Sequence, residues 1–515
     1  MSLKKKLENH KEYEKQMDIF IKKRFDSEKN SSLERIKRLL DKNSFSEIDM
    51  FVKHRCEKLK DKTLPREGVV TGYGTINNRQ VVVFSQDFSV LGGSLGEYHA
   101  KKICKVQKLA ERFRVPIIGI VESGGARIQE GIDSLNGYAN VIYNNTILSG
   151  LIPQITIVVG PSAGGSSYSA GLTDFIFMIK NKSKMFITGS KVIKVLTGEK
   201  INDEELGGSE VHSKISGVSQ IVTKNEEECM NKVRELLSYL PSNCYEPVSS
   251  SFYDRSKENI IAHLNSDTFI KKNTIDDEIL EIIPDNPKKA FDMKSVINLI
   301  MDKNDFFEVY EYYAKNIITG FSRIKGITVG IIANQPTELA GAIDNHASIK
   351  AARFIRFCDS FNIPILTFVD NPGFWPGKNE EHHGIIRNGA KLLYAYSEAT
   401  VPKITINIRK AFGGGYIAMC SKGLGADMVF AWPTSEIAVM GPKGSAKIVL
   451  DKTKNISTEN LDKAVHENTY KGVERGFIDT IIDPRETRIS IIRTLTMLLN
   501  NKSTSIDKKH GNIPL

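Results

Sequence analysis

Two stretches of the chain show the same succession of apolar patterns. Each begins with a β-branched run typical of a buried strand, continues with apolar residues at helical spacing, and then enters a strand that carries a proline near its start. A third strand follows and runs directly into glycines. The predicted strands are Gln80–Ser85, Val115–Val121 and Gln154–Val159, then Thr328–Ala333, Ile363–Val369 and Lys403–Ile408; the predicted helices are Ala100–Arg114 and Ser348–Asn362. This alternation predicts an α/β fold.

The two stretches are copies of one sequence. Their matching segments are Val70–Tyr73 with Ile318–Phe321, Arg114–Ile117 with Asn362–Ile365, and Ile152–Ile157 with Val401–Ile406. The first two pairs lie 248 residues apart and the third 249, so one residue has been inserted between them. The polar stretch Leu240–Arg255, rich in serine and interrupted by prolines, is the best boundary. We therefore predict two domains of one fold, over residues 1–250 and 251–515.

Composition and charge limit the kinds of partner and ligand that the protein is expected to bind. The 71 Lys and Arg residues exceed the 61 Asp and Glu residues, which gives a net charge of +10. No arginine-rich run and no interleaving of aromatic and basic residues is present, so a nucleic-acid partner is not expected. A solvated lysine-rich surface explains the surplus, and a substrate that carries several phosphates is the alternative. The charge alone does not decide between them.

The sequence favours a cytoplasmic protein without a bound metal. The six cysteines are far apart and form no CxxC pair, which argues against a cysteine-ligated zinc site and fits a reducing compartment. No apolar run approaches the ~20 residues of a membrane span, and Met1–Lys6 opens a polar helix rather than a signal peptide. His382 and His383 are adjacent and lack a surrounding frame of ligands, so we expect a surface loop there.

Glycine-rich turns follow two of the predicted strands in each half. They are Glu122–Arg127 and Gly160–Gly165 in the first half, and Asp370–Phe374 and Lys410–Gly415 in the second. Glycine allows a ligand to approach the backbone, and a turn from strand to helix points free amides at one place. Two such turns would form an oxyanion hole, which needs no titratable side chain. Tight packing of strand ends would also select glycine, but the duplication of all four turns favours function.

Other motifs permit competing interpretations. Gly160–Gly164 satisfies G-x-S-x-G, the nucleophile elbow of serine hydrolases, with Ser162 as the nucleophile. The repeat-related position of the second half carries Ala411, however, and no histidine in the sequence can be assigned to Ser162 as its general base. A serine hydrolase is therefore a remote alternative. Gly92–Gly96 resembles a phosphate loop but lacks its lysine, and we expect it to shape the turn before a helix that begins near Glu97. For Trp375 and Trp432, core packing is the first expectation and pocket lining the second.

At these turns the sequence resembles the carboxyltransferase (β) subunits of propionyl-CoA carboxylase and related acyl-CoA carboxylases. The resemblance covers most of the chain, from about Leu33 to Arg488. The segments that carry it are Gly92–Ile103, Ser123–Gly131, Leu206–His212, Ile283–Met293, Phe361–Pro364, Gly384–Leu393, Ala431–Gly441 and Glu474–Asp479. Near Asn30–Arg35 the sequence departs from the family pattern. The resemblance implies two duplicated crotonase-like domains of the ClpP/crotonase superfamily.

The resemblance also implies a mechanism and a set of site residues. Carboxybiotin on a separate carrier protein would release CO₂, the ureido nitrogen would take the α-proton of an acyl-CoA, and the enolate would attack CO₂. Residues implied at the thioester of the coenzyme A substrate are Gly124, Gly125, Ala126, Arg127, Gly164 and Gly165. Those implied at biotin are Gly373, Phe374, Gly414, Gly415 and Tyr416. Ile417, where propionyl-specific relatives usually carry an aspartate, is placed near the acyl end of the pocket.

The same resemblance implies partners. The chain contains no ATP-grasp region and no biotinylation site, so a biotin carboxylase and a biotin carboxyl carrier subunit are expected. The family forms hexamers in which the first half of one subunit and the second half of its neighbour share each site. The alternative is the carboxyltransferase subunit of a sodium-pumping acyl-CoA decarboxylase or a transcarboxylase. A further alternative is a CoA-binding assembly component with a decayed site, against which the intact turns argue.

Overall fold

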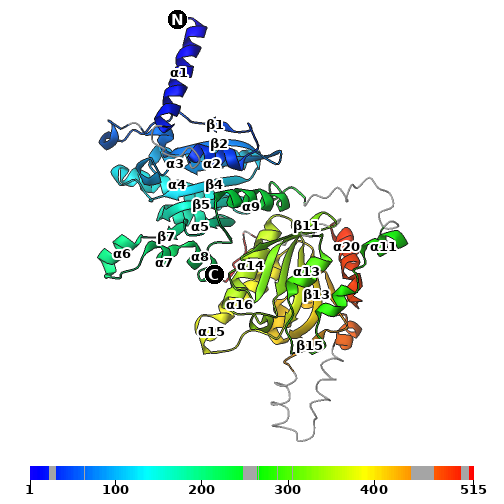
Figure 1. Cartoon of the computed structure of the whole chain (residues 1–515). Helices are drawn as coiled ribbons and strands as arrows, with labels where there is room; N and C mark the ends of the chain where they lie inside the picture. Colours follow the sequence, from blue (N-terminus) through cyan, green and yellow to red (C-terminus); the bar gives the residue numbers. More distant parts are fainter. Residues whose placement is uncertain are drawn as a thin grey trace. The chain divides into compact units, whose positions relative to one another are not determined.

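The chain forms two compact units, Met1–Tyr245 and Glu246–Leu515 (Figure 1). A computed structural model describes residues 1–22, 31–62, 64–247, 264, 266–286, 288–303, 305–441, 469–499, 508 and 510–514. The predicted domain boundary between residues 250 and 251 lies outside these described residues. We describe each unit by itself, because each has its own sheet and its own helices.

The first unit is a mixed sheet covered by helices. Its strands are β1 (Ser46–Ile48), β2 (Val69–Ile76), β3 (Arg79–Gln86), β4 (Ile117–Ser123), β5 (Gln154–Ala163), β6 (Phe175–Ile179), β7 (Lys184–Phe186) and β8 (Ile221–Thr223). Its α-helices are α1 (Leu3–Lys22), α2 (Ser32–Leu39), α3 (Glu97–Phe113), α4 (Ile132–Leu148), α5 (Gly165–Gly171), α6 (Ser190–Thr197), α7 (Asp203–Gly207), α8 (Ser209–Lys214) and α9 (Glu226–Tyr239).

The second unit repeats this plan. Its strands are β9 (Phe306–Val309), β10 (Ile317–Ile324), β11 (Ile327–Asn334), β12 (Ile365–Asn371), β13 (Lys403–Phe412), β14 (Met428–Ala431), β15 (Glu436–Ala438) and β16 (Thr480–Ile481). Its α-helices are α11 (Asp267–Asn273), α12 (Glu278–Ile282), α13 (Met293–Ile300), α14 (Asn345–Ser360), α15 (Lys378–His382), α16 (Ile385–Glu398), α17 (Gly413–Ala418) and α20 (Thr487–Leu498).

Strand order confirms the α/β class and the duplication. The first sheet runs β1-β2-β3-β4-β5-β6-β8 with β7 beside β5, and the second runs β9-β10-β11-β12-β13-β14-β16 with β15 beside β13. In both sheets the first three strands are antiparallel and the others are parallel. Even the register break recurs, between Val121 and Ser123 in one sheet and between Val369 and Asn371 in the other. The two units are therefore copies at the level of single residues.

The observed elements extend further than the sequence pattern predicts. Helix α14 begins three residues before the predicted Ser348, because the Asp344 carboxylate caps it by accepting the Ala347 amide at 2.7 Å. The strands β5 and β13 continue four residues beyond their predicted ends, so Gly160–Ala163 is strand rather than turn. The physical reason is the register break, after which β5 pairs with β7 and β13 with β15. The turns themselves begin only at Gly164 and Gly413.

The hydrophobic core of each unit lies between the sheet and its helices. In the second unit, one cluster joins the central strands to α13 and α20, with Ile331, Leu366, Ile406 and Ile492 all fully buried. In the first, α3 and α4 pack over β3 and β4 through residues such as Val106 and Ile117. None of the helices in the described part of the chain is long and apolar enough to cross a membrane.

Candidate active site

The first turn of the first unit follows β4, and two of its amides donate hydrogen bonds within the unit. The Gly124 amide donates to the Gly92 carbonyl at 2.9 Å, and the Gly125 amide donates to Ser123 Oγ at 3.1 Å. Gly125 has φ +99°, a conformation that favours glycine. The next amide, that of Ala126, has no acceptor among the described residues. Of the predicted donors in this turn, Ala126 is the one that is free to bind a ligand.

The second turn follows β5 and leads into α5. Gly164 has φ +59°, and its amide donates to the carbonyls of Phe186 and Ile187, both at 3.1 Å. Gly165 is the first residue of α5, and the amide of a first helical residue has no intrahelical acceptor. The α-carbon of Gly165, which carries no side chain, lies against the Tyr138 ring. A methyl group at this position would approach the ring to 2.6 Å. The free amide of this turn is therefore at Gly165, at the positive end of a short helix.

The two turns of the first unit are neighbours in space. Ser123 at the end of β4 is paired with Ser162 at the end of β5. A methyl group at Gly125 would lie 3.2 Å from the Ala163 carbonyl oxygen, so the first turn passes directly over the end of β5. The free amides of Ala126 and Gly165 thus come from adjacent strand ends. This arrangement can stabilise one oxyanion.

The second unit has the same construction with different side chains. Asn371 replaces Ser123, and its Oδ1 accepts the Gly373 amide at 2.7 Å. The Phe374 amide, like that of Ala126, has no acceptor among the described residues. Gly413, with φ +54°, is the conformational counterpart of Gly164, so Gly414 corresponds to Gly165. The Phe374 ring lies against Gly414, since a methyl group there would approach it to 3.3 Å.

Gly415, the other donor predicted in this turn, is the third residue of α17. Its amide also has no intrahelical acceptor, but its α-carbon is packed against Asn371, whose side chain would lie 2.6 Å from an added methyl group. Tyr416 and Ile417 follow on the same helix. Burial raises the pKa of Tyr416, which keeps its hydroxyl protonated, and Ile417 is 48% exposed. Ile417 therefore belongs to the accessible surface of α17 rather than to the core.

Arg127, which we expected at the substrate, is occupied by partners within its own unit. Its side chain is completely buried, and its guanidinium donates to the Glu67 carboxylate, to Glu130 Oε1 at 2.7 Å and to the Ser94 carbonyl at 3.1 Å. Every one of these partners belongs to the first unit. Arg127 thus fastens the first turn to Glu67 and to the Ser94 carbonyl by its buried guanidinium.

The structure also gives the surroundings of the other candidates from the sequence, which are Ser162, the turn at Gly92, Trp432 and Trp375. Ser162 is fully buried, and its hydroxyl donates to Ser166 Oγ at 2.9 Å rather than to a histidine, so the serine hydrolase interpretation lacks its general base. The predicted turn at Gly92 does precede helix α3. Trp432 is buried and donates to Thr487 Oγ1 at 2.9 Å, as core packing requires. Trp375 is 42% exposed, so the core interpretation is wrong for it.

No metal site appears in the part of the chain that the structure describes. No group of three or more His, Cys, Asp or Glu side chains is arranged there to hold an ion. His382 ends the short helix α15, and the His383 ring nitrogen Nδ1 lies 2.7 Å from the Asn379 carbonyl. Both histidines are exposed; His382 lies on a short helix rather than in the expected loop, and His383 lies in the turn that follows it.

Comparisons with known proteins identify the family. A family model described as a carboxyl transferase domain matches residues 23–513. The chain is 52% identical over 501 residues to the methylmalonyl-CoA decarboxylase subunit alpha of Veillonella parvula, covering 96% of this chain and 95% of the relative. It is 48% identical over 507 residues to the propionyl-CoA carboxylase carboxyltransferase subunit of Haloferax mediterranei, with the same coverage of both chains.

A solved structure confirms the predicted fold. The transcarboxylase 12S crystal structure, a hexamer with methylmalonyl-coenzyme A and methylmalonic acid bound, superposes with a TM-score of 0.92 at 43% identity, covering 100% of both chains. The two duplicated domains of this chain are thus crotonase-like, as the family resemblance implied.

Proposed function

We propose that this chain, which belongs to the carboxyl transferase family, moves a carboxyl group between biotin and the α-carbon of a short-chain acyl-CoA. Family membership makes the chain a carboxyltransferase of the kind used by biotin-dependent acyl-CoA enzymes. The acyl group, the direction of transfer and the roles of individual residues belong to the proposal.

One observation carries the proposal. Among the described residues, the repeat-related amides of Ala126 and Phe374, and those of Gly165 and Gly414, have no protein acceptor, whereas the amides of Gly125, Gly164 and Gly373 donate hydrogen bonds within their own unit. Carboxyl transfer from biotin to a thioester develops negative charge on two oxygens, the thioester oxygen and the ureido oxygen. Two separate pairs of donors match this requirement, since each pair can stabilise one oxyanion without a titratable group.

We assign the first pair to the acyl-CoA thioester and the second to biotin. Biotin, when bound, supplies the carboxyl group and a ureido nitrogen that accepts the α-proton. Phe374 and Gly414 would hold the ureido oxygen by their amides, and the Phe374 ring would wall that site beside Gly414. Ala126 and Gly165 would hold the thioester oxygen. Gly125, Gly164 and Gly373 shape the turns, and Gly415 packs the start of α17.

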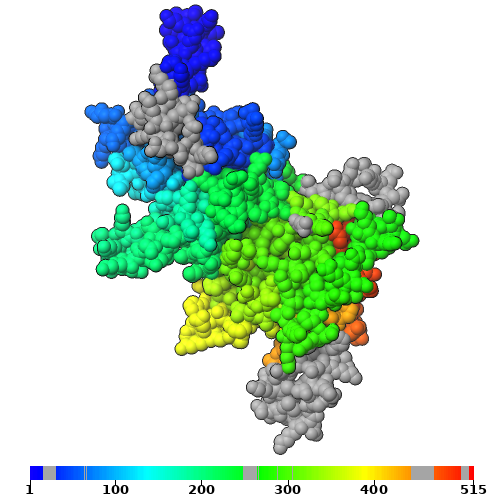
Figure 2. All heavy atoms as spheres, in the orientation of Figure 1, coloured from blue at the N-terminus to red at the C-terminus, as the bar shows by residue number. Residues whose placement is uncertain are grey.

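The proposed active assembly is a homohexamer that works with a biotin-bearing partner. Each site would combine the first unit of one subunit with the second unit of its neighbour. Helix α6 is consistent with such an interface, because Val192, Val195 and Leu196 expose apolar side chains on a segment that projects from the first unit (Figure 2). Apolar surface of this kind on a soluble domain commonly marks a contact with another chain.

Carboxylation as the β subunit of an acyl-CoA carboxylase is our first candidate for the direction. Decarboxylation is the second, and the 52% identity to the methylmalonyl-CoA decarboxylase subunit favours it specifically. The same donors serve both directions, so the partner decides. A biotin carboxylase encoded beside the chain would support the first, and a multispan membrane subunit the second.

A half-reaction tests the proposed chemistry. Purified protein is incubated with malonyl-CoA or methylmalonyl-CoA and a biotin derivative, and acyl-CoA and carboxybiotin are measured. We expect both products, with turnover that depends on the biotin species. Equal turnover without any biotin would refute the proposal.

A further inference from the structure

An acidic residue precedes the first turn in both units. Glu122 occupies this position in β4 and Asp370 the repeat-related position in β12. The next side chain in each strand, Ser123 or Asn371, accepts the amide of the second turn glycine. The backbone at Glu122 and Asp370 therefore determines where the free amides of Ala126 and Phe374 lie.

In the second unit an arginine of the neighbouring strand neutralises this carboxylate. Arg409 of β13 donates to Asp370 Oδ2 through Nη2 at 2.8 Å and through Nε at 3.2 Å. Asp370 Oδ1 also accepts the Lys410 amide at 3.0 Å. Both side chains are buried, so the pair fastens the end of β12 to the end of β13.

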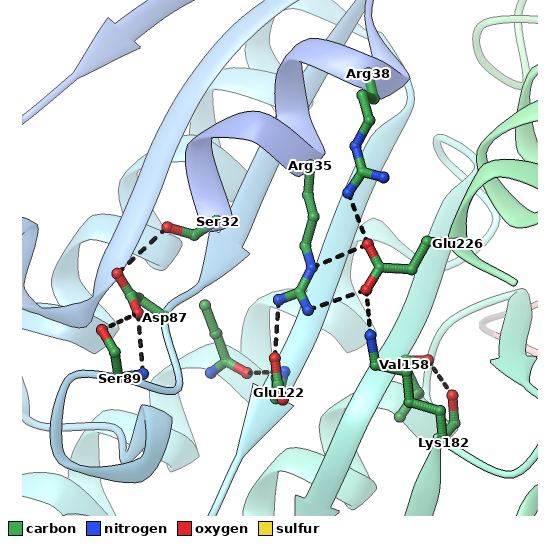
Figure 3. A network of polar contacts seen from close by, with 11 residues as sticks. Ser32, Arg35, Arg38, Asp87, Ser89, Glu122, Val158, Lys182 and Glu226 are labelled. Carbon is green, nitrogen blue, oxygen red and sulfur yellow. Dashed lines mark hydrogen bonds and ion pairs between the residues drawn. The ribbon is translucent and has the colours of Figure 1, made fainter. Parts of the chain in front are cut away.

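The first unit cannot use this solution, because Gly160 stands where the second unit has Arg409. The Glu122 carboxylate fills the space beside that glycine, and a methyl group at Gly160 would lie 2.3 Å from Glu122 Oε1. The neutralising cation is supplied instead by Arg35 of α2, whose Nη1 donates to Glu122 Oε2 at 2.8 Å (Figure 3). The Arg35 side chain is 5% exposed.

Arg35 also connects the first turn to a second carboxylate. Its Nη2 donates to Glu226 Oε1 at 3.1 Å, and Glu226 accepts from Arg38 at 2.7 Å and from Lys182 at 2.5 Å (Figure 3). Lys182 lies just before β7, whose last residue, Phe186, accepts the Gly164 amide. The network thus extends from the first turn to the strand that holds the second turn, whereas Arg409 binds Asp370 of the adjacent strand and, through Nη1 at 2.9 Å, the Lys289 carbonyl.

We infer that Arg35 is a positioning residue for the oxyanion site of the first unit, and that it acts through Glu122. This inference rests on the proposed function, in which Ala126 and Gly165 hold the thioester oxygen. In the first unit the cation that neutralises the carboxylate comes from helix α2, and in the second unit it comes from the neighbouring strand β13. Loss of Arg35 leaves the partly buried Glu122 carboxylate, 15% exposed, without its cation, and we expect the strand end to move so that the carboxylate becomes more hydrated. Glu226 keeps Arg38 and Lys182 and does not need Arg35 for charge balance.

The test compares two ligands that differ in one oxygen. Binding of an acyl-CoA thioester and of the matching CoA thioether, which lacks the carbonyl oxygen, is measured calorimetrically together with the half-reaction. In the wild type we expect a preference for the thioester of about tenfold, from two amide hydrogen bonds. Arg35→Gln should remove this preference and lower kcat by about tenfold to hundredfold, with thioether affinity unchanged within about threefold. Arg35→Lys should recover part of both.

Matched controls separate positioning from general damage. Arg409→Gln removes the corresponding cation of the second unit and should raise KM for biotin while the thioester preference persists. If Arg35→Gln fails to fold, the double variant Arg35→Gln/Glu122→Gln leaves no unpaired charge and should still lose the preference. A folded Arg35 variant that retains the full preference would overturn the inference. A wild type without biotin-dependent transfer would instead overturn the proposed function.

Discussion

At the scale of single residues, the site is defined by which backbone amides already have acceptors. Gly124, Gly125, Gly164 and Gly373 look equivalent to the proposed donors in sequence, but their amides bind carbonyls or side chains of the same unit. Positive φ at Gly125, Gly164 and Gly373 indicates that these glycines shape the chain rather than bind the ligand. Substitutions that remove an amide without adding bulk can distinguish the two roles.

Gly414→Pro removes one proposed donor. Proline lacks an amide hydrogen and is tolerated in the first turn of a helix, and the preceding Gly413 accommodates the restriction that proline imposes. We expect a loss of about 10²–10³ in kcat of the half-reaction. Gly414→Ala is the control, since it adds a similar contact with Phe374 and keeps the amide; it should lose far less. Comparable activity of the two variants would contradict the assignment of Gly414.

Ile417 is expected to influence the choice of acyl group. An apolar residue replaces the aspartate of propionyl-specific relatives at this accessible position of α17. One methylene of contact is worth ~1–3 kcal/mol of discrimination, so tenfold changes are accessible. We predict that propionyl-CoA is not strongly preferred over acetyl-CoA or butyryl-CoA. The measurement is kcat/KM for the three substrates on wild type and Ile417→Asp. An unchanged ranking in the variant would mean that Ile417 only packs against its own helix, and a strongly propionyl-selective wild type would refute the prediction.

At the scale of elements, charged side chains join the short helix α2 to the sheet and to helix α9. Helix α2 has eight residues, too few to be stable alone, and Arg35 and Arg38 bind it to Glu226 at the start of α9. Burial alone would raise the pKa of Glu226, but Arg35 and Lys182 outweigh burial and hold it at about 2. The carboxylate therefore remains charged well into the acid range.

This shift predicts an acid-dependent loss of stability. A carboxylate whose pKa is lower in the folded state than its ordinary 4.5 stabilises the fold above pH 4.5 and ceases to do so as the pH falls to about 2. The contribution is roughly 3 kcal/mol. We expect Glu226→Gln to lower the thermal midpoint at pH 7 and the difference from wild type to narrow below pH 4.5. A difference that stays constant down to pH 3 would contradict the predicted linkage.

At the scale of the whole molecule, duplication of one fold gives two similar candidate anion sites. The copies keep the strand order, the register break and the free amides. They differ in the side chains that support the turns, Ser123 against Asn371 and Arg35 against Arg409. Gene duplication followed by such local changes can make one site fit a thioester and the other a ureido group.

The proposed sharing of sites between subunits can be tested by complementation. Ala126→Pro removes the free donor of the first turn, and its preceding Gly125 tolerates the proline. Ala126→Pro and Gly414→Pro should each be inactive alone. If each site combines two subunits, hexamers reassembled from a mixture contain some sites with both intact halves, and activity should return to about a quarter of wild type by random pairing. Mixtures with no activity, in spite of subunit exchange shown by mass spectrometry, would contradict shared sites.

The sequence by itself determined the architecture of this protein. The 248-residue repeat, the order of strands and helices and the glycines at the strand ends are local patterns, because periodicity and backbone freedom are properties of neighbouring residues. The same patterns located all four turns and the family resemblance. They also placed Gly165 and Gly414 among the candidate donors, since the first amides of a helix have no intrahelical acceptors.

Only the tertiary structure decided which of those backbone amides lack an acceptor and which side-chain contacts hold the turns in place. Arg127 was expected at the substrate, and the structure shows its side chain buried against Glu130, three residues away, and against Glu67, 60 residues away in the chain. Arg35 lies 87 residues from Glu122 and appeared in a segment that departs from the family pattern. In the sequence, only one feature indicated a need for Arg35: position 160 carries glycine where the repeat-related position 409 carries arginine. Long-range charge pairs depend on where the strands end in space, which no local pattern encodes.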